Sequence, residues 1–308
     1  MHPQPIHLSS GNLLADRRYE WARDAIETGD LAAAADLLMQ ALELAPGYAA
    51  AWFALGGVRE KLGQREEAIA AFRKAREADP GDRHGARLHL IRLGAQPQSA
   101  MPEGYVRAVF DGYAPDFDRA LTEGLSYRGP ELLLRAVERA CGGKMKFGTA
   151  LDLGCGTGLA GAAFRPFVDW LVGVDLSPQM LARAKEKGLY DRLVEDDVLR
   201  FLGAEAALKA RYHLILAADV FVYLDDLAPV LKAAAQVLAP GGFLAFSVET
   251  HDGGGVILRE TLRYAHGQAH VRAALAAAGL RLISLDSAST RTEKGEPVPG
   301  SIVVAGGA

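Results

Sequence analysis

The residues that could do chemistry are concentrated in one short segment, Asp152-Leu-Gly154-Cys-Gly156-Thr-Gly158. Glycine tolerates positive φ and lets a ligand approach the backbone closely. The helix predicted to follow would direct its free N–H groups into the turn. The run from Gly156 to Gly161 also fits the G-x-G-x-x-G pattern of dinucleotide sites, which is weak on its own. The segment therefore predicts a nucleotide-type site and leaves the nucleotide open.

Acidic residues narrow the choice of ligand. Asp152 would place a carboxylate under the loop, which disfavours a pyrophosphate and favours a ligand with positive charge. Asp175 ends the next predicted strand, where its two oxygens can accept both hydroxyls of a ribose. Asp196 and Asp197, followed by Val198, end the third strand and could accept a hydrogen bond from an adenine amino group.

Alternating apolar strands and helices would position these residues. Strands are predicted at 149–155, 171–175, 192–195, 212–217 and 242–249, and helices at 159–167, 178–187 and 227–238. This alternation predicts an α/β fold with helices on both faces of a parallel sheet, whose ligands bind at the carboxyl ends of the strands. Strands at 280–290 and 301–305, joined by a polar loop at 291–300, predict a final antiparallel hairpin.

The order of these motifs resembles the S-adenosylmethionine (SAM)-dependent methyltransferases over residues 108–306. Leu-Asp-Leu-Gly-Cys-Gly-Thr-Gly is followed by Val-Gly-Val-Asp-Leu-Ser, an acidic end of the third strand, and Leu-Ala-Pro-Gly-Gly before the fifth strand. The resemblance implies a seven-stranded, Rossmann-like class I sheet, SAM as cofactor and S-adenosylhomocysteine as product. It assigns Asp152, Gly154 and Gly158 to the methionine part and Gly156 to the same cofactor-binding loop. It assigns Asp175 to the ribose, Leu176 to the adenine face, and Asp197, with Asp196 and Val198, to the adenine edge.

The prediction of residues that contact the methyl acceptor depends on less specific sequence signals. Residues 105–128 resemble a segment that folds over the cofactor in small-molecule methyltransferases, and the alternative is an amphipathic helix packed on the sheet. We expect Tyr113 and Asp219 at the cofactor. The candidate acceptor contacts are Phe117, Arg128 and Tyr264, and the candidate catalytic groups are Tyr223, His266 and Glu249. A solvated arginine and a structural histidine are the alternatives for Arg128 and His266. No metal-ligand spacing is visible, and no metal is expected.

A repeat precedes this region. Trp52, Leu55, Gly56, Ala68, Phe72, Ala75 and Pro80 have the spacing of a tetratricopeptide repeat (TPR), and Ala34, Leu38, Ala41 and Pro46 match it 34 residues earlier. The pattern departs from the repeat at Trp21 and Arg59. A helix at 85–93 would cap the array. We therefore predict helical repeats with a cap at 1–96, a linker and lid-like helices at 97–146, and a SAM-binding domain at 147–308.

Composition restricts the partners. The 34 basic and 38 acidic residues give a net charge of −4, which does not favour a nucleic-acid partner. No leader or membrane span is expected, and two distant cysteines, Cys141 and Cys155, suit the reducing cytoplasm. The leading hypothesis is methylation of a small-molecule or carrier-bound acceptor, with the repeats for protein interaction or homo-oligomerisation. The alternatives are a protein methyltransferase recruited by the repeats and a non-catalytic SAM-binding adaptor.

Overall fold

The computed structural model describes residues 9–119, 121, 124, 126–293 and 295–307. The chain forms two compact units, and their boundary in the sequence falls between Val109 and Phe110, inside helix α6 (Glu103–Tyr113). The predicted domain limits at residues 96 and 146 stay a prediction. Among the described residues, no helix is both long and apolar enough to cross a membrane.

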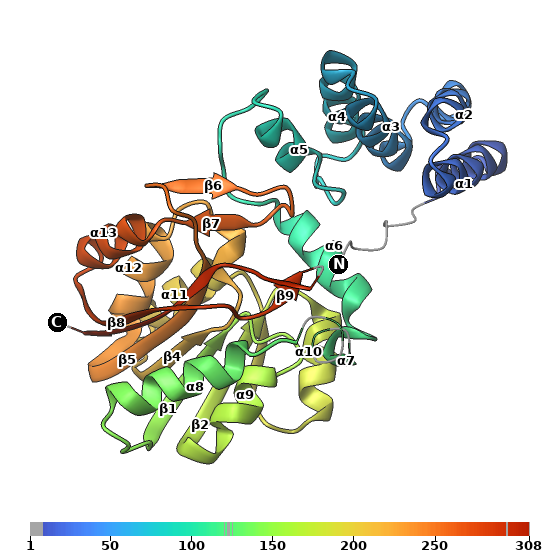
Figure 1. Ribbon diagram of the computed structural model, residues 1–308. Helices are drawn as coiled ribbons and strands as arrows, with labels where there is room; N and C mark the ends of the chain where they lie inside the picture. Colours follow the sequence, from blue (N-terminus) through green and yellow to red (C-terminus); the bar gives the residue numbers. More distant parts are fainter. Residues whose placement is uncertain (1–8, 120, 122–123, 125, 294, 308) are drawn as a thin grey trace. The chain divides into compact units, whose positions relative to one another are not determined.

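The first unit consists of helical hairpins, which confirms the predicted repeats (Figure 1). Its helices are α1 (Leu13–Thr28), α2 (Leu31–Leu44), α3 (Ala49–Lys61), α4 (Arg65–Ala78) and α5 (Ala86–Arg92). Asn12 and Asp30 cap α1 and α2 by accepting backbone N–H groups of the first turn. A Cβ atom on Gly56 would lie 2.6 Å from Cε1 of Phe72, so this glycine allows α3 and α4 to approach closely.

A twisted sheet forms the centre of the second unit. Its main path has the order β3-β2-β1-β4-β5-β11-β8, and the final strand β11 is antiparallel to both of its neighbours. This order confirms the predicted class I sheet and its closing hairpin. The strands of the path are β1 (Phe147–Leu153), β2 (Val168–Asp175), β3 (Arg192–Glu195), β4 (Tyr212–Ala217), β5 (Leu238–Glu249), β8 (Leu280–Ala288) and β11 (Gly300–Gly307).

Four short strands were not predicted. β6 (Val256–Leu258) and β7 (Tyr264–His266) join the sheet next to the end of β5. β9 (Thr292–Glu293) and β10 (Glu296–Pro297) pair within the segment that was predicted as a polar loop. Strands of two or three residues are too short to give a hydrophobic period.

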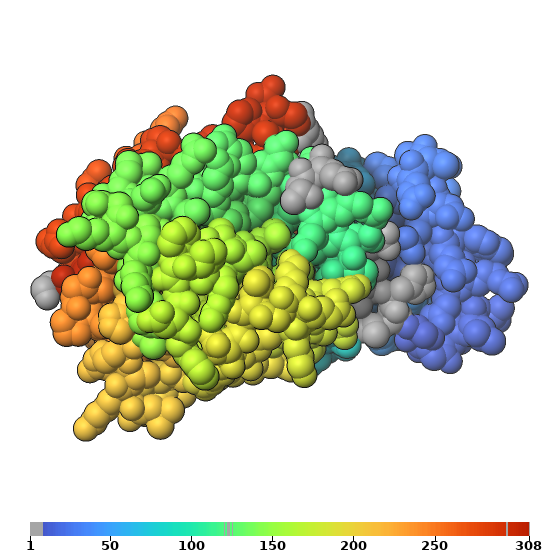
Figure 2. Space-filling view, turned by 90° about the horizontal axis from the view of Figure 1, so that it is seen from below, coloured from blue at the N-terminus to red at the C-terminus, as the bar shows by residue number. Residues whose placement is uncertain are grey.

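Helices cover both faces of the sheet. On one face, α8 (Gly129–Ala140) and α9 (Leu159–Phe164) bury Leu133 and Phe164, and this face is the green surface in Figure 2. The other face carries α11 (Val198–Ala207), α12 (Ala228–Val237) and α13 (Gln268–Ala277) over a core that includes Phe201 and Leu231. Helix α10 (Pro178–Glu186) follows β2. The sequence did not predict α11 and α13.

Candidate functional site

The glycine loop joins β1 to α9 in backbone conformations that other residues rarely adopt. Gly154 has φ of 60°, and a Cβ there would lie 2.5 Å from Cγ2 of Val220. Gly158 has φ of 91°, and a Cβ there would lie 3.0 Å from the ring of Tyr190. Gly156 also has positive φ. Glycine is therefore required at Gly154 and Gly158 both by the positive φ and by the close packing of Val220 and Tyr190.

Asp175 fixes this loop to the end of β2. Its Oδ2 accepts the N–H of Gly156 at 2.8 Å, and its Oδ1 accepts the N–H of Ser177 at 2.8 Å. The side chain is buried. Burial raises the pKa of Asp175 to about 6, although both backbone N–H groups oppose the rise and the carboxylate of Asp111 adds to it.

Asp152 lies beneath the loop. Its residue is 1% exposed, and its Oδ2 accepts the hydroxyl of Tyr190 at 2.7 Å. Its other oxygen, Oδ1, has no hydrogen-bond partner among the described residues. Burial raises the pKa of Asp152 to about 7, and the Tyr190 hydrogen bond limits that rise. A carboxylate in this state would ionise readily beside a positively charged ligand.

The segment predicted as a lid contacts the glycine loop. Asp111 of α6 accepts the hydroxyl of Ser177 at 2.5 Å. Asp118 of α7 (Phe117–Arg119) accepts the hydroxyl of Thr157 and pairs with Nζ of Lys187 at 2.6 Å. These bonds place the described part of the segment beside the cofactor loop. Residues 120, 122, 123 and 125 of the predicted lid lie outside the described residues.

Aromatic side chains of this segment lie toward the predicted acceptor side. The ring of Phe110 lies 6.0 Å from that of Phe117 and 5.5 Å from that of Tyr223. Phe117 also faces Gly156, because a Cβ on that glycine would lie 3.8 Å from the phenylalanine ring. The Tyr113 hydroxyl is buried without a partner among the described residues, and burial raises its pKa to about 12. The structure therefore brings the two predicted aromatics, Tyr113 and Phe117, to this side.

The acids at the end of β3 are engaged in local hydrogen bonds. Asp197 caps α11, because its Oδ1 accepts the N–H groups of Leu199 and Arg200. Asp196 Oδ1 accepts the N–H of Asp197 at 2.8 Å and pairs with Arg200 at 2.9 Å. Val198 is buried and Leu176, after Asp175, is half-buried. Contact of these residues with an adenine stays a prediction.

A buried ionic cluster lies where β4 and β5 end. Arg263 reaches three groups: Oδ2 of Asp219 at 3.0 Å, Oε1 of Glu249 at 2.6 Å and the hydroxyl of Tyr223 at 2.8 Å. Arg291 joins the same two carboxylates at 3.3 and 3.0 Å. Burial alone would raise the pKa of Asp219, but the two guanidinium groups hold it below its usual value. The predicted residues Asp219, Glu249 and Tyr223 thus meet in one cluster.

The remaining predicted residues lie in other surroundings. His266 is fully buried, its Nε2 lies 3.2 Å from the Phe221 carbonyl oxygen, and burial lowers its pKa to about 4. Tyr264 is also fully buried. The Arg128 side chain lies at the surface, 3.4 Å from Glu131. These surroundings favour the structural alternative for His266 and the solvated one for Arg128, and the roles of all three in the reaction stay predictions.

Several residues of the site were not anticipated from the sequence. Tyr190 supports both Asp152 and the glycine loop, and Asp111 and Asp118 hold the lid segment. Arg263 and Arg291 organise the ionic cluster. For Asp111 and Asp118, the only signal was their place in the predicted lid. Arg263 directly precedes the predicted residue Tyr264, whereas Tyr190 and Arg291 are common residue types in loops that only the fold brings to the site.

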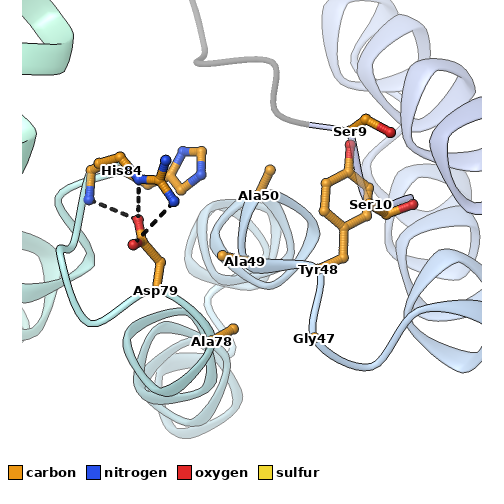
Figure 3. A pocket seen from close by; sticks show the side chains of 10 residues that line it. Ser9, Ser10, Gly47, Tyr48, Ala49, Ala50, Ala78, Asp79 and His84 are labelled. Carbon is orange, nitrogen blue, oxygen red and sulfur yellow. Dashed lines mark hydrogen bonds and ion pairs between the residues drawn. The ribbon is translucent and has the colours of Figure 1, made fainter. Parts of the chain in front are cut away.

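A separate pocket belongs to the repeat unit alone. It has a volume of about 150 Å³ and lies between the residues before α1, the first turn of α3 and the loop after α4 (Figure 3). Tyr48 and His84 line it, and each has a buried polar atom without a partner among the described residues. All of its lining residues precede residue 85, so it is distinct from the glycine loop. The described residues hold no group of three His, Cys, Asp or Glu that could bind a metal ion.

Comparison with known proteins agrees with both units. Residues 151–244 match the methyltransferase domain family, and residues 25–90 match the tetratricopeptide repeat family. The chain contains a methyltransferase domain and tetratricopeptide repeats. The methyltransferase domain shares its fold with magnesium protoporphyrin IX methyltransferase from Synechocystis PCC 6803, with a TM-score of 0.50 and 16% identity over 69% of this chain and 100% of that one.

Curated relatives match this domain over a limited length. Human methyltransferase-like protein 27 is 42% identical over 111 residues, which are 35% of this chain and 45% of the relative. Ribosomal protein L11 methyltransferase from Xylella fastidiosa is 37% identical over 38% of this chain and 37% of the relative. Malonyl-[acyl-carrier protein] O-methyltransferase from Enterobacter lignolyticus is 30% identical over 35% of this chain and 41% of the relative. The chain thus spans less than half the length of each of these relatives.

The ionic cluster generates a prediction for the methyltransferase domain. Arg263→Met would leave the buried carboxylates of Asp219 and Glu249 undercompensated, so we expect a loss of about 3–5 kcal/mol in unfolding free energy. Scanning calorimetry of the full chain would measure it as a lower melting temperature. The control is Arg135→Met, which breaks a pair with Glu131 whose side chains are 60% and 45% exposed and should cost at most about 1 kcal/mol. Equal melting temperatures for the two variants would contradict the prediction.

Proposed function

We propose that this chain is a SAM-dependent methyltransferase that acts on a small-molecule or carrier-bound acceptor, with the repeat unit serving protein interaction. The observation that carries the proposal is a pair of buried carboxylates, Asp152 and Asp175, on either side of the glycine loop. A pyrophosphate would meet the negative charge of Asp152 under the loop, whereas the sulfonium and ammonium of SAM would compensate it. Asp175 suits the ribose of either cofactor.

The residues present fit SAM as a bound group. Asp152 has one buried oxygen without a hydrogen-bond partner among the described residues, which suits a nearby cation. Gly154 and Gly158 hold the loop in its positive-φ conformation against Val220 and Tyr190, and the methionine part would lie along this loop. Asp175 would accept the ribose hydroxyls, and Leu176 with the acids that follow β3 would surround the adenine.

The protein's own contribution to the reaction is to position the acceptor and to exclude water. SAM supplies a methyl group that is already activated by the sulfonium. Phe110, Tyr113, Phe117 and Tyr223 would form an apolar wall around the transfer path and hold the acceptor in line. Asp111 and Asp118 would keep the lid segment over the loop through their bonds to Ser177 and Thr157. Tyr223 accepts a hydrogen bond from Arg263, which leaves its hydroxyl proton free to point at an acceptor.

Support for the acceptor class comes from this aromatic wall and from one relative. Aromatic and apolar linings are typical of small-molecule sites. The Enterobacter relative is named for a carrier-bound acceptor, malonyl-[acyl-carrier protein]. The alternative, a protein acceptor recruited by the repeats, is favoured by the relative named for ribosomal protein L11.

Cofactor binding tests the ribose assignment. Asp175→Ala removes a charged acceptor, so we expect SAM affinity to fall by about 1.5–3 kcal/mol in isothermal titration calorimetry. Asp169→Ala is the matched control, because Asp169 is an exposed acid at the other end of the same strand. If the Asp175→Ala variant bound SAM with unchanged affinity, the assignment of Asp175 to the ribose would be wrong.

The raised pKa values predict pH dependence. With pKa values of about 7 and 6, Asp152 and Asp175 are largely protonated at pH 5.5, and Asp152 must ionise to bind a cation and Asp175 to accept both ribose hydroxyls. SAM affinity should therefore rise about tenfold to hundredfold from pH 5.5 to 7.5. Calorimetry in buffers of different ionisation enthalpy would detect the released protons. Asp152→Asn should flatten the profile, and a profile that is already flat in the parent protein would contradict the electrostatic account.

The acceptor is tested by transfer of labelled methyl. Incubating the protein with radiolabelled SAM and a cell extract, then separating small molecules, carrier-bound material and other proteins, should place label in the first two fractions. Asp175→Ala serves as the inactive control. Label in proteins other than carriers would favour the alternative acceptor, and no transfer despite SAM binding would favour a non-catalytic adaptor.

A further inference from the structure

The outer face of α1, the first helix of the repeat unit, carries unusual apolar exposure. Its inner face buries Ala15, Tyr19 and Ala22. On the outer face Leu14 is 61% exposed and Trp21 is 46% exposed, seven residues apart and therefore on one side of the helix. The outer face of a terminal repeat is normally polar. A half-exposed tryptophan at this end is the kind of residue that anchors protein interfaces.

Two opposite charges flank this apolar face. Arg17 and Asp24 are also seven residues apart, and both side chains are exposed. Neither has a hydrogen bond or an ion pair with the side chains that the structure describes. On the opposite flank, Arg18 already lies over the Trp21 ring at 5.0 Å. Among the described residues, Arg17 and Asp24, with the exposed Glu20 between them, therefore lie along one edge of the face.

We propose that a second copy of this chain packs its α1 antiparallel against this face, about a two-fold axis between Glu20 and Trp21. A two-fold contact is self-complementary, so each residue meets a partner the same distance beyond the axis. With a rise of 1.5 Å per residue, Arg17 and Asp24 both lie about 5 Å from this axis along the helix. Arg17 then faces Asp24 of the partner subunit, and the same pair forms a second time by symmetry.

The same register accounts for the apolar residues. Trp21 lies next to the axis, so the two tryptophans meet at the centre of the contact. Leu14 lies toward the end of the contact and covers the partner's last turn. A single helix pair is smaller than a standard protein interface, so we expect a dissociation constant in the micromolar range.

Charge exchange tests the register. Sedimentation velocity of the full chain, from about 1 to 200 µM, should give a monomer–dimer equilibrium. Arg17→Asp and Asp24→Arg each place like charges opposite one another twice, so each variant alone should dimerise about tenfold more weakly or worse. An equimolar mixture of the two variants restores both opposite-charge contacts, and it should regain dimerisation near the parent level.

Two controls separate this contact from general effects. Arg73→Asp, at an exposed position of α4, makes the same charge change away from α1 and should leave the equilibrium unchanged. Trp21→Glu should abolish dimerisation, with an unchanged circular dichroism spectrum. A chain that stays monomeric at 200 µM would overturn the proposal. The proposal would also be overturned if the α1 variants did not weaken dimerisation, or if the mixture of Arg17→Asp and Asp24→Arg did not restore it. SAM affinity is measured independently, so its outcome does not bear on this test.

Discussion

The hydrogen bonds that Asp175 accepts from Gly156 and Ser177 are the constraint on which the site depends. They join the loop after β1 to the start of the helix after β2, so two crossovers of the sheet are held together by one carboxylate. The lid segment is attached to the same place, because Asp111 bonds to Ser177. Burial disfavours the ionised form of Asp175, whereas the two backbone N–H donors stabilise it. The geometry of the loop and the charge state of the site are therefore coupled through one side chain.

A second set of charged residues, the ionic cluster, lies at the predicted acceptor side. Asp219 adopts φ of 60°, a strained conformation for a residue other than glycine. It is retained there by Arg263, Arg291, Thr290 and Ser247. Removing either arginine would leave the buried carboxylates undercompensated, which makes the cluster a fixed support rather than a flexible surface. Tyr223 is oriented by this support and faces the aromatic residues of the lid segment.

The sequence predicted the parts of the fold that depend on local pattern. Strand β4 is largely buried and appears as an apolar run, so it was predicted at its observed limits, and the short β3, which is exposed or half-buried, was also predicted at its observed limits. Strand β5 begins at Leu238, four residues before the predicted start, because Ala-Pro-Gly-Gly has the composition of a turn and yet continues the strand. Helix α11 was missed because Asp197 was interpreted as a ligand-binding acid, whereas it also caps the helix. The ionic cluster joins residues 219, 263 and 291, which only the tertiary fold brings together.

The position of β11 affects the order in which the methyltransferase domain can fold during synthesis. This strand is buried and lies between β5 and β8, and it forms ladders with both. On the main path of the sheet, β8 reaches the other strands only through β11, although β8 is made first. During synthesis, one edge of β5 would therefore stay unpaired, and β8 would lack its neighbouring strand, until residues 300–307 leave the ribosome. Until then both strands expose unpaired backbone groups that could pair with other chains. The last strand thus acts as the step that closes the sheet and ends this period of exposure.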